Sequence, residues 1–209
     1  MPNWCQNSIK IEGPADKIKA LWEKAENADF SKDADGNVKT VFGLLQAMRP
    51  MPEELRGTTK GSGEELQTTF IDGCNNWYDW RVKHWGTKWD IDSEGLDLIE
   101  NSDGTAEITG WFDSAWSPPV SAYEHFVSEN PELKLYADYY ESGDDFTGVW
   151  EYDGEDIRDQ YFDSISDELE KFEDKWDPAF RELNDNYGFT DEEWRFEDED
   201  NEDEGVPIP

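Results

Sequence analysis

The segment NSIKIEGPADKIKALWEKAEN, residues 7–27, carries a strand signal that is followed at once by a helix signal. Residues 8–12 alternate in polarity, which is typical of a half-buried strand, and Gly13-Pro14 ends that pattern. Apolar residues then recur at helical spacing from Ile18 to Ala25, which predicts a helix with one apolar face over residues 15–27. A strand that leads into an amphipathic helix favours a fold with both α and β elements.

Further along the chain, helix signals and strand signals alternate. Helices are predicted over residues 76–85, stopped by Gly86, and from Pro118-Pro119 to Asn130-Pro131. Extended segments are predicted over residues 88–92, 95–101, 105–114, 133–140 and 146–152. The apolar run over residues 41–48 fits a helix and a strand equally well. This order predicts one α+β domain over residues 1–157, a sandwich in which helices cover one face of an antiparallel sheet.

After residue 157 the pattern changes. Apolar residues from Ile165 to Leu183 fall three or four positions apart, with Pro178 as a break, so we expect an acidic helical extension over residues 158–196. Residues 197–209 form an acidic tail for which we expect flexibility. Residues 151–209 contain 24 acidic and 5 basic residues, a net charge of −19. The extension is therefore expected to be the most densely charged part of the protein.

The charge of the whole chain restricts its partners. Asp and Glu number 52 against 18 Lys and Arg, for a net charge of −34, a pI near 4.1 and a mean hydropathy of −0.94. Such values are typical of disorder, but 11 Trp, 8 Tyr and 11 Phe supply enough large rings for a folded body with an aromatic core. An anionic surface repels nucleic acids and anionic membranes. A basic partner is the expected one.

Neither secretion nor metal chemistry is indicated. The N-terminal residues lack the basic and apolar regions of a signal peptide, and no stretch approaches 18 consecutive apolar residues, so we expect a cytoplasmic protein. Cys5 and Cys74 lie far apart in the sequence without a CxxC or Cys/His cluster. They are expected to be free thiols, with no disulfide framework, zinc site or other cofactor.

Four segments resemble the YubB-type ferredoxin-like proteins of phages and conjugative plasmids. They are MPNWCQN (1–7), RPMPEEL (49–55), WYDWRVKHWGTKW (77–89) and GWFDSAWSPP (110–119). The resemblance covers the first 120 residues, continues weakly through Gly148 and Gly154, and does not reach the helical extension. It implies a ferredoxin-like α+β fold and an origin in a mobile element, but no catalytic mechanism or ligand. The term describes topology, because two isolated cysteines exclude an iron–sulfur cluster.

The aromatic segments admit two interpretations. They could form a pocket that stacks a base or another planar ligand, or they could simply pack the core, which is the commoner role of such rings. The pocket residues would be Asn3, Trp4, Trp77, Trp80, Arg81, Trp85, Lys88, Trp89 and Trp116, and the same aromatic segments contain Tyr78, Trp111 and Phe112. Lys88 is the best indication of a site, because it lies between two tryptophans. In either case we expect the tryptophans to converge on one side of the domain.

No catalytic residues are assigned. His84 and His125 each lie alone on a predicted helix, without a nucleophile or a second ligand at motif spacing, which favours structural or surface roles. Carboxylates are so abundant that acidic pairs such as Asp144 and Asp145 carry little information. The protein is therefore expected to act by binding rather than by catalysis.

The acidic clusters have three interpretations: a solvated surface that confers solubility, adaptation to high salt, and mimicry of DNA. The presence of 12 Lys against 6 Arg argues against salt adaptation. Combined with a mobile-element origin, mimicry predicts an inhibitor that occupies the basic groove of a nucleic-acid-binding host or defence protein. The expected contact residues are Asp163, Asp167, Glu168, Glu170, Glu173 and Asp174. The alternative is a ligand- or protein-binding module that uses the aromatic pocket, with the acidic surface serving only solubility.

Overall fold

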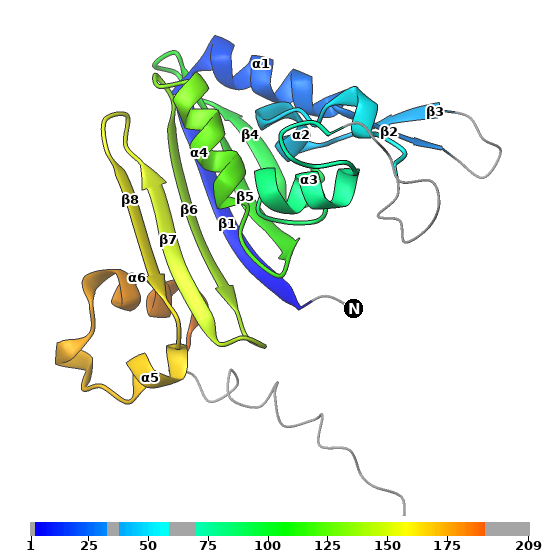
Figure 1. Ribbon diagram of the computed structural model, residues 1–209. Helices are drawn as coiled ribbons and strands as arrows, with labels where there is room; N and C mark the ends of the chain where they lie inside the picture. The colour runs from blue at the N-terminus through cyan, green and yellow to red at the C-terminus, as the bar shows by residue number, and fades with distance from the viewer. Residues whose placement is uncertain (1–2, 33–37, 59–69, 191–209) are drawn as a thin grey trace, which may run out of the picture.

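A computed structural model describes residues 3–32, 38–58 and 70–190 of the chain (Figure 1). The strands are β1 (Trp4–Pro14), β2 (Asp29–Lys32), β3 (Val38–Val41), β4 (Leu96–Glu100), β5 (Thr105–Ala115), β6 (Lys134–Glu141), β7 (Phe146–Tyr152) and β8 (Ile157–Phe162). The α-helices are α1 (Ala15–Glu26), α2 (Leu44–Met48), α3 (Trp77–His84), α4 (Val120–Glu129), α5 (Ile165–Leu169) and α6 (Pro178–Tyr187), and 3-10 turns η1 (Glu53–Leu55) and η2 (Glu173–Lys175) complete the list. None of these helices is long and apolar enough to cross a lipid bilayer.

Six strands form one antiparallel sheet in the order β4-β5-β1-β6-β7-β8, and β2 pairs with β3 in a separate hairpin. The strand predicted from the first segment, β1, lies in the middle of the sheet between β5 and β6. Its register with β5 runs from Trp4 opposite Ala115 to Pro14 opposite Thr105. The predicted α+β class with an antiparallel sheet is confirmed.

The main core lies between this sheet and helices α1 to α4 (Figure 1). Alternation along β1 points Ile9 and Ile11 toward the helices, where Ile18 of α1 and Phe126 of α4 pack against the same cluster. The helical spacing noted in the sequence is thus the buried stripe of α1. Residues 41–48, for which a helix and a strand fitted equally well, divide between the end of β3 and α2.

The other face of the sheet is covered in part by the C-terminal segment. Trp150 and Val149 are neighbours on β7 and therefore point to opposite faces. Trp150 contacts Tyr123 of α4, whereas Val149 joins a second cluster with Phe180 and Leu183 of α6. Helices consequently lie on both faces of the sheet, because β6 and β7 present apolar residues on both sides. The sequence had predicted helices on one face of the domain, with the extension outside it.

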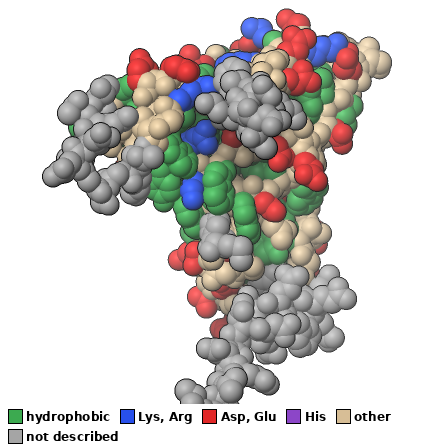
Figure 2. Space-filling view, turned by 90° about the vertical axis from the view of Figure 1, so that its right-hand side faces the viewer, with side chains coloured by type: hydrophobic (Ala, Val, Ile, Leu, Met, Phe, Trp, Pro, Cys, Tyr) green, Lys and Arg blue, Asp and Glu red, His purple; other side chains and the backbone are tan. Residues whose placement is uncertain are grey.

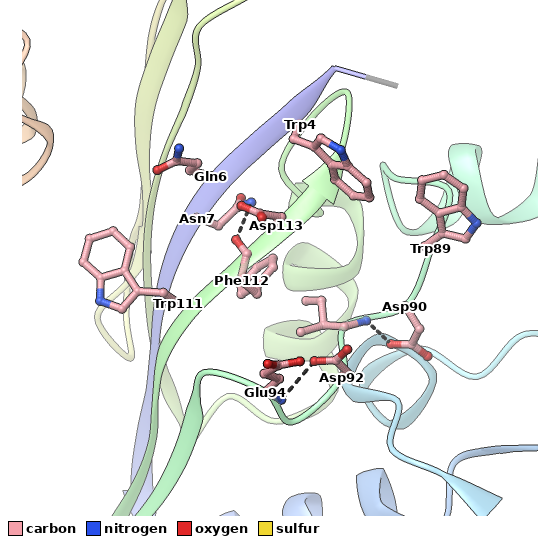
Figure 3. A pocket seen from close by; sticks show the side chains of 11 residues that line it. Trp4, Gln6, Asn7, Trp89, Asp90, Asp92, Glu94, Trp111, Phe112 and Asp113 are labelled. Carbon is pink, nitrogen blue, oxygen red and sulfur yellow. Dashed lines mark hydrogen bonds between the residues drawn. The ribbon is translucent and has the colours of Figure 1, made fainter. Parts of the chain in front are cut away.

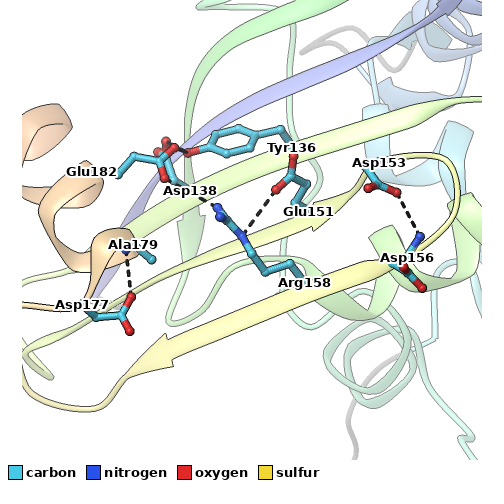
Figure 4. Close-up of polar contacts among 9 residues, drawn as sticks. All are labelled: Tyr136, Asp138, Glu151, Asp153, Asp156, Arg158, Asp177, Ala179 and Glu182. Carbon is cyan, nitrogen blue, oxygen red and sulfur yellow. Dashed lines mark hydrogen bonds and ion pairs between the residues drawn. The ribbon is translucent and has the colours of Figure 1, made fainter.

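The sheet also continues past residue 157. Residues 157–162 form β8, which pairs with β7 throughout its length. Helix α6 then begins with Pro178 in its first turn and Asp177 as its N-cap, whose Oδ1 accepts a hydrogen bond from the N–H of Ala179 at 2.9 Å (Figure 4). It ends at Gly188, whose φ of 70° is the left-handed conformation that favours glycine at a helix end. The tail predicted over 197–209 lies outside the described residues, as do residues 191–196.

Polar contacts accompany the apolar docking of α6. Asp138 of β6 is only 2% exposed, and its two oxygens accept four hydrogen bonds. The donors are Ser8 Oγ at 2.6 Å, Tyr187 Oη at 2.6 Å, Asn186 Nδ2 at 2.9 Å and Tyr136 Oη at 3.1 Å. Two of these donors come from α6, so this carboxylate joins the sheet to the C-terminal segment. Arg158 of β8 adds ion pairs to Glu151 and to Glu182 of α6 (Figure 4).

Candidate functional site

Helix α3 places part of the predicted pocket in the core. The Asn76 side chain caps this helix by accepting a hydrogen bond from the N–H of Asp79. Trp80 and Trp85 are then buried, and Trp85 Nε1 donates to the carbonyl oxygen of Arg49 at 2.8 Å. These two rings therefore serve packing, which is the alternative that the sequence left open for them. Neither borders the hollow described below.

The other aromatic candidates form a connected group beside α3. Trp4 stacks on Trp89 with ring centroids 5.5 Å apart. Trp4 is 48% exposed and Trp89 is 37% exposed. Lys88 Nζ lies 4.3 Å from the Trp89 ring centroid and 5.8 Å from those of Trp116 and Tyr78. The position of Lys88 between two tryptophans is thus explained by cation–π contacts on the surface.

Trp77 and Arg81 link the buried rings to the surface group. The Arg81 guanidinium lies 4.4 Å from the Trp85 centroid and 5.4 Å from that of Trp77. Tyr78 contacts both Trp77 and Trp116 edge to face. The structure therefore brings the predicted tryptophans into neighbouring positions, although only part of the set is accessible.

Asn3 and Trp116, the remaining pocket candidates, are joined by a backbone hydrogen bond. The carbonyl oxygen of Asn3 accepts a hydrogen bond from the N–H of Trp116 at 3.0 Å. Trp116 has a φ of 70°, a conformation that costs a non-glycine residue on the order of 1 kcal/mol. The contact to Asn3 helps to hold this turn after β5 in place.

A hollow of about 490 Å³ lies beside the first residues of β1 and the last residues of β5, next to the surface tryptophans (Figure 3). Its lining residues are Trp4, Gln6, Asn7, Trp89, Asp90, Ile91, Asp92, Glu94, Trp111, Phe112 and Asp113. Figure 3 shows Trp4 and Trp89 on one side, Trp111 on the opposite side, and Asp92 and Glu94 near one end. The hollow therefore combines exposed aromatic rings with carboxylates.

Two glycines meet beside the hollow, next in sequence to its lining residues Glu94 and Trp111. Gly110 has a φ of 147°, and a Cβ atom there would lie 1.9 Å from the carbonyl oxygen of Gly95. This close approach marks the last pair between β4 and β5, Leu96 opposite Gly110. Beyond it, β5 continues without a β4 partner, and residues 89–94 line the hollow beside it.

Asp90 has a structural role at the edge of the hollow. Its oxygens accept hydrogen bonds from the N–H groups of Leu45 at 2.7 Å, Ile91 at 2.8 Å and Gln46 at 3.1 Å. Burial raises the pKa of the Asp90 carboxyl to about 6, although these three donors and the charge of Arg81 act in the opposite direction. This carboxylate orients the start of α2 and fixes the course of residues 89–92.

Most of the lining residues were not predicted from the sequence. Acidic and polar residues are so common in the chain that no pattern distinguishes Gln6, Asp92, Glu94 or Asp113. A usable signal was the alternation of Trp111 and Asp113 on β5, which places both side chains on one face. The register that pairs Gln6 with Asp113 then adds β1 to the same site, and no sequence pattern reveals that register.

The two histidines lie apart from this hollow. His84 is buried, and its Nδ1 lies 2.6 Å from Nη2 of Arg49. Burial, and then the Arg49 charge, lower the pKa of His84, and burial is also the main cause that lowers the pKa of His125. Among the described residues, no three His, Cys, Asp or Glu side chains are grouped so as to hold a metal ion. Cys5 and Cys74 are both buried, and burial raises the pKa of each thiol.

The predicted contact carboxylates of the extension lie on and around α5 and η2. Asp163, Asp167, Glu170, Glu173 and Asp174 are exposed, whereas Glu168 is partly buried and pairs with Lys171. They are held near the sheet by Ile165, which is fully buried, and by the docking of α6. On the side of the molecule shown in Figure 2, carboxylates lie in several separate groups around a central hydrophobic area.

Comparison with known proteins identifies no family. No family model matches the sequence, and no curated protein matches it. The fold is similar to that of a crystal structure of the protein api92 from Yersinia pseudotuberculosis, which carries the family-model designation DUF1281. The two share 11% sequence identity with a TM-score of 0.43, over 76% of this chain and 98% of that one. This similarity does not assign a function to the chain.

Proposed function

We propose that the protein is a non-enzymatic accessory protein of a mobile element, a phage or plasmid, that acts in the host cytoplasm. It mimics DNA and thereby inhibits a basic, nucleic-acid-handling host or defence protein. The proposal rests on the net charge of −34 carried by a folded body, together with the resemblance of residues 1–120 to YubB-type proteins. That charge disfavours direct binding of nucleic acid.

The topology supports the ferredoxin-like part of the resemblance. The elements β1, α1, β4, β5, α4 and β6 follow the βαββαβ order of ferredoxin-like domains. In the sheet their strands are ordered β4-β5-β1-β6, with the first strand between the third and the last. β7 and β8 extend this unit by a hairpin.

The observation that carries the proposal is the placement of exposed carboxylates on a docked segment. Asp163 and Asp167 lie close in sequence to Ile165, which is buried in the same cluster as Val149 of the sheet. Their positions are therefore restrained relative to the sheet. Restrained carboxylates can engage the Lys and Arg residues of a groove that otherwise holds phosphates, so each contact excludes DNA from the same groove.

Affinity capture from host lysate with a six-site variant tests this proposal. The variant replaces Asp163, Asp167, Glu168, Glu170, Glu173 and Asp174 by Asn or Gln. A matched control removes the same number of charges from exposed carboxylates elsewhere: Asp16, Glu23, Glu54, Asp97, Glu124 and Glu155. We expect wild type and control to retain a nucleic-acid-binding protein at low salt and the six-site variant to lose it. Equal capture by all three would refute the role of the extension.

The hollow between Trp4, Trp89 and Trp111 favours a second candidate function, a binding module in which the acidic surface serves only solubility. Three exposed tryptophans around one hollow are unusual for side chains that have only a packing role. Under this alternative, substitution of Trp4 and Trp111 would abolish partner binding while the six-site variant would bind normally. The two candidates are therefore separated by the same capture experiment.

A further inference from the structure

The hollow beside Trp4 has an unusual chemical lining. Trp4, Trp89 and Trp111 are 48%, 37% and 53% exposed, so their rings are accessible from solvent. The carboxylates of Asp90, Asp92, Glu94 and Asp113 also line it, and no Lys, Arg or His is among the described residues that do so. Aromatic faces and carboxylates both attract cations. An anionic ligand would be repelled by these carboxylates.

A buried acceptor without a partner is a second, independent indication of a site. Asn7 is only 1% exposed and lines the hollow, and its Nδ2 donates to the carbonyl oxygen of Cys5 and to Ser114 Oγ. Its Oδ1 is buried and has no hydrogen-bond partner within the described part of the chain. A buried acceptor that lacks a donor is costly, and among the described lining residues Asn7 is the one that has such an atom.

We propose that this hollow binds the guanidinium group of an arginine side chain. Guanidinium is planar, stacks on aromatic rings, is weakly hydrated and presents five N–H donors, whereas an ammonium is compact and strongly hydrated. Trp4 and Trp111 supply aromatic surfaces, and Glu94 and Asp113 supply exposed carboxylates. The identity of the arginine as part of a basic protein partner rests on the proposed function.

Neighbouring contacts support the same chemistry. The surface tryptophans already hold one cation, because Lys88 Nζ lies 4.3 Å from the Trp89 centroid. Lys88 itself does not line the hollow. Trp111 is positioned on its other side by an edge-to-face contact with Tyr187 of α6, at 5.7 Å between centroids. Docking of the C-terminal segment therefore contributes to the orientation of one ring of the site.

Titration of the full chain with N-acetylarginine amide, followed through the tryptophan indole N–H signals by NMR, tests the proposal. The indole signals of Trp4, Trp89 and Trp111 are assigned with single Trp→Phe variants. N-acetylcitrulline amide is the uncharged control probe, since it keeps the shape of arginine but lacks the charge. We expect arginine to shift these three signals saturably, and citrulline to bind at least about tenfold more weakly, as loss of a charge-assisted contact implies.

Two double variants locate the site. Glu94→Gln/Asp113→Asn removes two carboxylates from the hollow, and Glu23→Gln/Glu124→Gln removes two exposed carboxylates from α1 and α4. All four side chains are exposed, so both proteins are expected to fold, which the remaining NMR signals verify. The first variant should weaken arginine binding about tenfold and the second less than about twofold.

Each result has a distinct meaning. Equal binding of citrulline, equal effects of the two double variants, or no shift of the three indole signals would overturn the arginine site. Tighter binding of N-acetyllysine amide than of the arginine probe would overturn the choice of guanidinium. If arginine binding fails while salt-sensitive capture persists, only this inference is wrong. If arginine binds but no nucleic-acid-binding protein is captured, only the proposed function is wrong.

Discussion

Asp90 is a carboxylate whose burial has a measurable consequence for stability. Its folded-state pKa of about 6 lies above the unfolded value of about 4, so the Asp90 carboxyl binds a proton more tightly in the folded protein than in the unfolded chain. The contribution of Asp90 to stability is therefore greatest below pH 4 and declines as pH rises through the folded pKa. The substitution Asp90→Asn should destabilise the protein, because an amide cannot accept all the N–H donors of Leu45, Gln46 and Ile91.

Urea unfolding of wild type and Asp90→Asn at pH 5 and pH 7.5 measures this effect. The loss of unfolding free energy should be larger at pH 5 than at pH 7.5, since part of the wild-type advantage is already lost at the higher pH. An equal loss at both values would show that the Asp90 pKa is not raised on folding. A larger loss at pH 7.5 would show that it is lowered.

Asp138 is the residue whose removal should most disturb the docking of α6. Asp138→Ala leaves the hydroxyls of Ser8 and Tyr187 without their acceptor, which should cost about 2–4 kcal/mol. Asp159→Ala, at an exposed position of β8, serves as the control and should change stability by less than about 0.5 kcal/mol. In the double variant with Tyr187→Phe the two losses should not add, because both remove the same hydrogen bond. Additive losses in urea unfolding would contradict this contact.

At the scale of elements, α6 is predicted to be held by its apolar face. Phe180→Ala should cost about 3–5 kcal/mol, because Phe180 is fully buried in the cluster with Val149. Phe172→Ala should have little effect, because Phe172 is 81% exposed between α5 and η2. Thermal unfolding measures the two losses, and limited proteolysis should cleave within α6 only in the Phe180 variant. If the Phe172 variant were as unstable as the Phe180 variant, the claim that Phe180 packs against the sheet while Phe172 is exposed would be contradicted.

How far the sequence predicts an element depends on how local its signal is. α1 was predicted to within one residue, because its apolar period is clear. β1 was predicted over residues 8–12 but extends from Trp4 to Pro14, because pairing with β5 continues beyond the alternating residues. α2 was left open, since five residues are too few to show a helical period. The apolar row from Ile165 to Leu183 identified residues that are buried, but it did not indicate which face of the sheet they cover.

The hollow could not be predicted from local sequence signals either. Its residues come from positions 4–7, 89–94 and 111–113, which meet only through the pairing of β1 with β5. The tryptophan-rich segments predicted Trp4 and Trp89 as pocket residues, but they predicted Trp80 and Trp85 as well, and these two are buried. Composition cannot separate core rings from surface rings, because both kinds lie in the same short segments.

At the scale of the whole molecule, the charge of −34 opposes folding and favours a basic partner. The apolar clusters on both faces of the sheet offset that repulsion and hold the charged C-terminal segment in place. A partner bound through such charges should be released by salt, since salt screens exposed charges and restores counterions to both surfaces. Release by salt alone would not distinguish DNA mimicry from any other electrostatic association.

Competition by duplex DNA distinguishes them most directly. The captured partner is bound to the immobilised protein at low salt and challenged with increasing concentrations of duplex DNA at constant ionic strength. If the protein occupies the DNA-binding groove, the duplex should displace the partner completely, and the fraction released should follow the partner's own affinity for DNA. If a ternary complex of protein, partner and DNA forms, or if saturating DNA releases nothing, the protein does not act as a mimic of DNA.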